Sequence, residues 1–260
     1  MKRTLLWLPA LLALCAANLF AQQATNDANP LYPAPSIHIG TIVVPPVADE
    51  PFSATALIEN RQIMPDGSTV VLRNVNLIGR DSRGRTHGEM RIWVPASSQA
   101  VPSLTEVLLY DPQTRTRTVC YTATHVATVL QRREPGDTPT AKISSSLKVK
   151  VEDLGPTTLD GIVVEGTRRI VTIPSQASGT GAPMTVVDEY WYSADLHLNL
   201  LLRHIDPRAG ERTVALSDIK REDPDPAFFE IPEGYRIIDV TPPPSAPAKR
   251  GGAAEGSPKQ

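Results

Sequence analysis

The feature that most constrains the fold is a regular succession of β-patterned runs separated by turn signals, and it is clearest over residues 188–235. Two runs, at 186–193 and 198–205, are followed by an Asp-Pro-Arg-Ala-Gly turn at 206–210 and by a return run at 211–219. Apolar residues two apart in the return run are typical of a half-buried strand. The stretch predicts three antiparallel strands, which are followed by a one-turn helix at 224–229.

The same pattern fills most of the preceding chain. Runs at 52–63, 68–79 and 85–94 are joined by Pro-Asp-Gly and Asp-Ser-Arg-Gly turns, which predicts a three-stranded meander. Further strand-like runs are expected at 104–110, 115–123 and 161–173. Residues 124–133 fit a short helix or a strand, and 144–151 stay undecided. Because no segment sustains a 3.6-residue period, the predicted class is all-β with a few short helices.

The N-terminus is typical of a secretory signal peptide. Lys2 and Arg3 precede a mostly apolar stretch at 4–20, and Ala21 suits a cleavage site. We expect a signal peptide at 1–21 and an exported protein in the periplasm or cell envelope. An uncleaved membrane anchor is the alternative, since the apolar stretch is near the minimum length for spanning a bilayer.

The rest of the chain divides by composition. Residues 22–50 are rich in proline and predict an extended linker, with one edge strand at 37–44. We expect a single β-rich domain at 51–240 and a disordered tail at 241–260. Only Cys120 remains once the signal is removed, so no disulfide forms within the mature chain and stability must come from the core.

Three motifs carry a family resemblance: Leu109-Tyr110-Asp111-Pro112, Trp191-Tyr192-Ser193 and the Asp-Pro-Ala-Phe-Phe-Glu-Ile-Pro segment at 225–232. With the order of strands, they resemble the bacterial lipoprotein-carrier group (LolA, LolB and RseB type) and uncharacterised secreted proteins of this type. The resemblance covers roughly 51–240. It implies a strongly curved antiparallel sheet, a half-barrel that wraps short helices. The motifs describe turns and packing, so no functional residue is carried over.

A curved sheet has a concave face that helices, side chains or a ligand must fill. Four rings on predicted strands are the candidate ligand-binding residues: Trp93, Tyr110, Tyr121 and Tyr192. Ordinary core packing is the alternative for these rings. The leading hypothesis is a non-enzymatic protein that holds a lipid, lipidated peptide or other apolar ligand. The competing hypothesis is an envelope protein-interaction or stress-sensing module with a filled core.

Signals for chemistry are weak. Ser145 and Lys148 match the S-x-x-K of serine acyl enzymes, but the partner S-D-N and K-T-G motifs are missing, so a serine hydrolase is the weakest alternative. The five histidines show no metal-ligand spacing, and neither a metal nor a cofactor is expected. A net charge of -2 without a basic patch argues against nucleic acid as a partner. The oligomeric state stays open.

Overall fold

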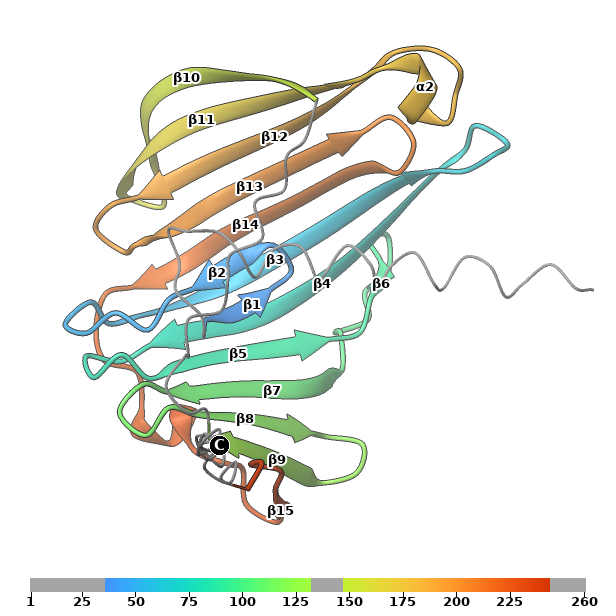
Figure 1. The fold of residues 1–260 in the computed structure, drawn as a ribbon. Coiled ribbons are helices and arrows are strands. Elements are labelled where there is room, and N and C mark those ends of the chain that lie inside the picture. Colours follow the sequence, from blue (N-terminus) through green and yellow to red (C-terminus); the bar gives the residue numbers. More distant parts are fainter. Residues whose placement is uncertain (1–35, 132–146, 244–260) are drawn as a thin grey trace, which may run out of the picture.

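The computed structural model describes residues 36–131 and 147–243, and within them one large sheet dominates (Figure 1). The strands follow one another across this sheet in the order β10 (Lys148–Leu159), β11 (Ile162–Ile173), β12 (Met184–Ser193), β13 (Leu198–Asp206), β14 (Gly210–Lys220), β3 (Phe52–Ile63), β4 (Thr69–Arg80), β5 (Thr86–Arg91), β7 (Leu104–Asp111), β8 (Thr116–Tyr121), β9 (Val126–Gln131) and β15 (Arg236–Asp239). The short β6 (Val94–Pro95) pairs with β4. A single turn of helix, α2 (Ser175–Ser178), follows β11.

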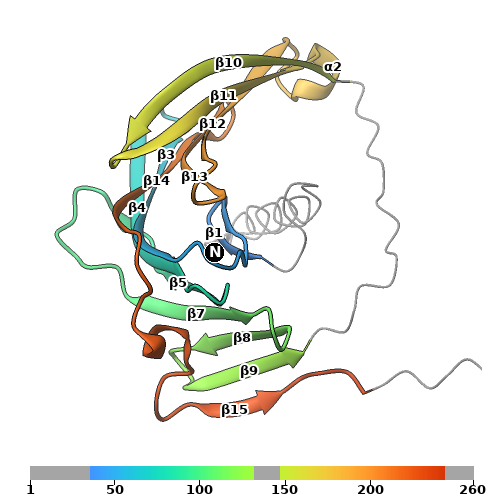
Figure 2. The ribbon, with the colours of Figure 1, turned by 90° about the vertical axis from the view of Figure 1, so that its left-hand side faces the viewer.

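The sheet curls through part of a circle and stays open on one side (Figure 2). Its neighbouring strands are antiparallel, except that β15 runs parallel to β9. The predicted fold class, an all-β chain with a strongly curved antiparallel sheet, is therefore confirmed. Within the stretch at 124–133, residues 126–131 form strand β9 rather than a helix, and residues 148–151 of the undecided stretch at 144–151 belong to β10.

Local sequence explains the regular strands. On β3 the inward residues Phe52, Ala54, Ala56 and Ile58 are 0–4 % exposed, as their alternation predicts. The turn after β3 uses Gly67 at a φ of 81°, a conformation that glycine adopts without steric cost. The three-stranded meander and the later strands lie where the sequence pattern indicated, except that the third strand ends at Arg91 and not at residue 94.

Residues 37–44 differ from the expected linker with one edge strand. They form a two-stranded hairpin, β1 (Ile37–Ile39) and β2 (Ile42–Val44), separate from the main sheet and inside its curve (Figure 2). Four aliphatic side chains of this hairpin are only 0–4 % exposed: Ile37, Ile39, Ile42 and Val44. They belong to the core because their alternation gives the hairpin one fully apolar face. Residues 1–35 and 244–260, which include the expected signal peptide, lie outside the described part.

The C-terminal segment covers the opposite face. A 3-10 turn, η2 (Pro226–Phe229), begins at Asp225, whose Oδ1 accepts a hydrogen bond from the Ala227 amide at 2.9 Å. Further along, Ile231 and Tyr235 pack on a second apolar cluster of the sheet, made of Val107, Leu109, Cys120 and Ala127. Leu108 belongs to the hairpin side and Leu109 to this side, since successive strand residues point to opposite faces. No helix in the described ranges is long and apolar enough to cross a membrane.

Candidate functional site: the concave face of the sheet

The β1–β2 hairpin fills the middle of the concave face. A Cβ at Gly88 of β5 would lie 2.7 Å from Ile39 Cδ1 and 2.8 Å from Ile37 Cγ2, so glycine is what allows β1 to approach the sheet. At the hairpin turn a Cβ on Gly40 would lie 2.8 Å from Ile58 Cδ1. The chain's own hairpin therefore occupies the middle of the concave face, where the leading sequence hypothesis placed a ligand.

Arg80 fixes this arrangement from inside the core. Its side chain is 0 % exposed, and its guanidinium donates three hydrogen bonds to backbone carbonyls: Nε to Glu50 at 2.8 Å, Nη1 to Pro45 at 2.9 Å and Nη2 to Leu196 at 2.9 Å. The cation also lies 5.2 Å from the centroid of the Phe52 ring. Burial lowers the pKa of Arg80 to about 10, so the group stays charged at neutral pH. One side chain thus joins the segment after β2, the β12–β13 turn and β4.

The sequence analysis did not single out Arg80. The available signal was its position two residues after Ile78, on the inward side of a strand whose neighbours alternate. A charged residue at an inward position indicates a buried polar network, because an unpaired charge in a core is strongly unfavourable.

The structure does not gather the four predicted rings into one site. Tyr110 is 5 % exposed and belongs to the core, whereas Tyr121 is 39 % exposed. They share a face because Tyr121 pairs with Glu106, which lies four residues before Tyr110 on β7. Tyr192 is half-buried on β12, in the other half of the sheet.

The sequence analysis placed Trp93 on a strand, and the structure differs there. Strand β5 ends at Arg91, and Trp93 lies in the connection before β6 with 40 % of its surface exposed. The chain leaves β5 at this point so that Val94 can pair with Arg73 of β4.

A polar row lies beside the apolar part of the concave face. Asp188 pairs with Arg169 at 3.3 Å and with His204 Nδ1 at 2.6 Å. Arg212 stands directly opposite His204 and, two residues before Val214, points to the face on which the hairpin lies. Burial lowers the pKa of Arg212, which makes no ion pair with any residue of the described ranges. This half-buried cation is suited to an anionic group.

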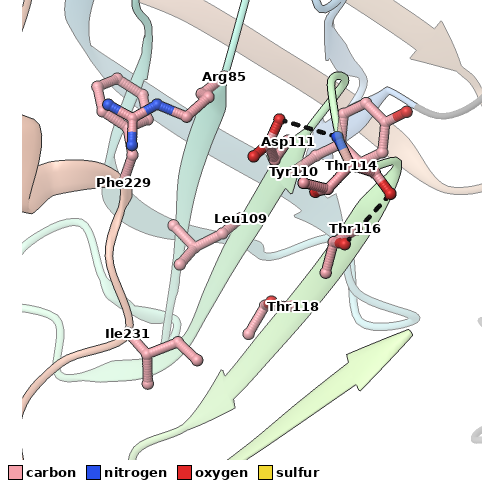
Figure 3. A pocket seen from close by; sticks show the side chains of 9 residues that line it. All are labelled: Arg85, Leu109, Tyr110, Asp111, Thr114, Thr116, Thr118, Phe229 and Ile231. Carbon is pink, nitrogen blue, oxygen red and sulfur yellow. Dashed lines mark hydrogen bonds between the residues drawn. The ribbon is translucent and has the colours of Figure 1, made fainter. Parts of the chain in front are cut away.

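The two clearest cavities formed by the described residues lie away from the concave face. One, of about 180 Å³, lies beneath the C-terminal segment and is lined by Leu109, Thr118 and Ile231, with Phe229 and Arg85 at one end (Figure 3). The other, of about 450 Å³, lies between the 81–85 turn and residues 223–226 and is lined largely by charged side chains. The first is below the usual volume of a ligand pocket, and the second is too polar for an acyl chain.

Cys120 and the Ser145/Lys148 pair are the remaining candidates for chemistry. Cys120 is 0 % exposed, and burial raises the pKa of its thiol to about 11, so it is protonated at neutral pH. Lys148 is exposed at the start of β10, and Ser145 lies outside the described residues. Within the described ranges, no three His, Cys, Asp or Glu side chains are grouped so that they could hold a metal ion.

No protein-family model matches the chain, and neither does any curated protein. Solved structures that are similar include MucB in the Pseudomonas aeruginosa MucA/MucB complex, with 9 % identity over 74 % of this chain and 59 % of that chain at a TM-score of 0.37. A DUF1329 family protein from Desulfovibrio piger has 13 % identity over 70 % of this chain and 90 % of its own, at a TM-score of 0.29.

A LolA superfamily protein from Nitrosomonas europaea has 12 % identity over 71 % of this chain and 91 % of its own, at a TM-score of 0.28. The chain spans less than two thirds of the MucB chain that it matches. The Nitrosomonas europaea protein carries the name of the group that the sequence motifs resemble, and the likeness concerns the fold alone.

Proposed function

We propose that this chain is a non-enzymatic, exported protein-interaction module of the bacterial cell envelope. The observation that carries the proposal is that the chain's own hairpin fills the middle of the concave face: the four inward side chains of the β1–β2 hairpin are 0–4 % exposed. The two clearest cavities formed by the described residues also lie away from that face. A curved sheet that is filled by its own chain keeps its shape without a ligand, so recognition falls to its outer surfaces.

The surface that best suits a protein partner is an exposed apolar patch, here called the tip patch. It lies at the β3–β4 turn, which projects beyond the rest of the sheet in Figure 1, and in the connection from β5 to β7. Its members are 39–81 % exposed and are Ile63, Met64, Val70, Ile92, Trp93 and Val101. Pairing of Leu72 with Pro95 holds the two segments together. Exposed apolar side chains on two segments that are held next to each other are suited to a protein interaction site.

Site-specific photocrosslinking in envelope preparations tests this proposal. We expect a photoreactive residue in place of Trp93 to give a discrete crosslinked protein band, which a second substitution, Val70→Asp, removes. Val163 of β11 is the matched control position, since it is apolar and 63 % exposed but outside the tip patch. Equal crosslinking at the two positions would contradict the proposal.

A second candidate is a carrier whose hairpin moves aside for an apolar ligand with an anionic group. Two observations favour it: β1 and β2 pair with each other and not with a strand of the main sheet, and Arg212 on the same face has no ion-pair partner among the described residues. The hairpin could leave without breaking a hydrogen bond of the large ladder.

Native mass spectrometry of the protein purified from an envelope fraction, followed by organic extraction, separates the two candidates. The interaction module predicts a mass without a bound ligand and no binding of an apolar fluorescent probe. A co-purifying acyl species that is lost on Arg212→Ala, and kept on Arg83→Ala at an exposed site, would favour the carrier.

A further inference from the structure

The two edges of the large sheet are very different. At one edge β15 has four residues and lies at the end of the C-terminal segment. At the other, β10 has twelve residues and no strand of the described ranges lies beyond it, as the top of Figure 1 shows. A long unpaired edge strand presents a row of free backbone donors and acceptors, which another strand can use.

Only the first half of β10 is suited to such pairing. Lys148 to Val151 are all exposed, and the apolar Val149 and Val151 are 44 % and 63 % exposed. Further on, the register with β11 shifts between Asp153 and Gly155, and Pro156 lacks an amide donor. The free edge is therefore a short segment, Lys148 to Asp153.

The face of the sheet at this segment carries a row of directly paired residues whose charges alternate, with one neutral position at Thr213. In order from the edge inward the row is Glu152, Arg168, Glu189, Arg203, Thr213, Glu59 and Arg73. Arg168 contacts Glu152 at 3.2 Å and Glu189 at 2.8 Å. The row ends at the free edge with Glu152, which Lys150 of the same strand also contacts at 2.8 Å. A basic residue on an added strand would meet the same carboxylate and continue the alternation.

We propose that β10 pairs in antiparallel fashion with β10 of a second copy of this chain, about a two-fold axis at Val151. This register places Lys150 of each copy opposite Glu152 of the other, on the face of the charged row. It also places Val151 opposite its own symmetry mate, which covers an exposed apolar side chain. The same patch serves both copies, as a closed two-fold dimer requires.

The neighbouring register is less favourable. An axis at Lys150 would place two ammonium groups directly opposite each other, which destabilises a strand pair. The charges along β10 are thus complementary to those of a second copy at the Val151 axis and not at the Lys150 axis.

The first test is the oligomeric state of the exported chain in solution, measured by sedimentation velocity over a concentration series. We expect a species of twice the monomer mass that Val151→Lys converts to monomer, because it places like charges at the axis. Val163→Lys, at an equally exposed valine of β11, should leave the dimer intact. Lys150→Glu should weaken dimerisation, and Lys150→Glu combined with Glu152→Lys should restore part of it. A wild-type chain that stays monomeric at all concentrations overturns the proposal.

Cysteine crosslinking tests the register. Directly opposed residues of antiparallel strands have Cα atoms about 4.5–5.5 Å apart, within the range for a disulfide. Under mild oxidation Val151→Cys should form a disulfide-linked dimer much faster than Val163→Cys. The native Cys120 is buried and should stay reduced in both. Equal rates at the two positions, or a disulfide from Cys at 151 to a different protein, would overturn the pairing of two copies.

Discussion

Two terminal segments of this chain cover opposite faces of one sheet, and they do so with different chemistry. The N-terminal hairpin presents aliphatic side chains that are almost completely buried, and Arg80 ties its flanking segment to the sheet. The C-terminal segment packs through aromatic rings. The Phe228 ring stacks on His87 with 3.6 Å between the ring centroids, and the guanidinium carbon of Arg85 lies 4.9 Å from the centroid of the Phe229 ring. The concave side therefore resembles the interior of a domain, whereas the convex cover is half exposed and depends on polar groups.

The largest expected effect comes from Arg80→Met. It leaves three carbonyls without their donor, each worth about 1–3 kcal/mol when buried, partly offset because a buried charge is removed. We expect the free energy of unfolding to fall by about 4 kcal/mol in urea denaturation. Arg80→Lys keeps the charge but cannot reach three carbonyls at once, so it should be intermediate. A loss below about 1 kcal/mol for Arg80→Met would contradict a structural role for this group.

The convex cover should be sensitive to acid through His87. Its Nδ1–H donates to the Phe228 carbonyl, and burial lowers the pKa of the ring to about 4. The unfolded chain, with a histidine pKa near 6.5, binds the proton first as the pH falls, so stability is lost between about pH 6.5 and 4. The shift corresponds to a loss of up to about 3 kcal/mol.

His87→Leu isolates this contribution from the titration of carboxylates. The variant should lose less stability than the wild type between pH 7 and pH 4, by about 3 kcal/mol at most. Urea denaturation of both proteins at several pH values gives the difference. Two curves that run parallel over this range would show that the native histidine is not held neutral.

A pair of valines compares the two faces of the hairpin itself. Val44 is 0 % exposed and Val43 is half-buried on the other side of β2. Val44→Ala should cost about 2 kcal/mol, because two methyl groups leave a filled core, and Val43→Ala less than about 1 kcal/mol. Thermal and urea unfolding of both variants provide the check. Equal losses in the free energy of unfolding would mean that the hairpin does not pack with the Val44 side against the sheet.

The smallest effect is expected at the start of η2. Asp225→Ala removes the acceptor for the Ala227 amide and should cost about 1 kcal/mol, the usual value of an N-cap. Asp225→Asn keeps an acceptor and should recover most of the loss. If the two substitutions are equally destabilising, the carboxylate acts through its charge rather than as a cap.

Local rules recovered most of the strands and turns. Alternation located β3 at its observed bounds, and the one-turn helix expected at 224–229 is present as the 3-10 turn η2. The hairpin at 37–44 was misjudged because its two strands have three residues each, too few to show a period amid nearby prolines. Tertiary packing against Gly88 and Ile58, which no local rule contains, makes it part of the core.

The candidate site was less predictable than the fold. Aromatic residues on strands look alike in sequence whether they line one cavity, as expected, or lie far apart in the sheet, as Tyr110 on β7 and Tyr192 on β12 do. Arg80 was overlooked because its three acceptors come from the backbone, which leaves no pattern of side chains. Hydrogen bonds to carbonyls of distant segments can be recognised only from the folded structure.

The pairing of β14 with β3 has a consequence for how the molecule reaches its native state. The first strand of the large sheet takes as its neighbour a strand that lies near the far end of the chain, so the centre of the sheet closes late. Such distant pairings carry a large loop-closure entropy and slow the search for the native topology. We expect β3, β4 and β5 to form a meander first. The edge of β3 then stays unpaired until residues 210–220 have been synthesised and can pair with it.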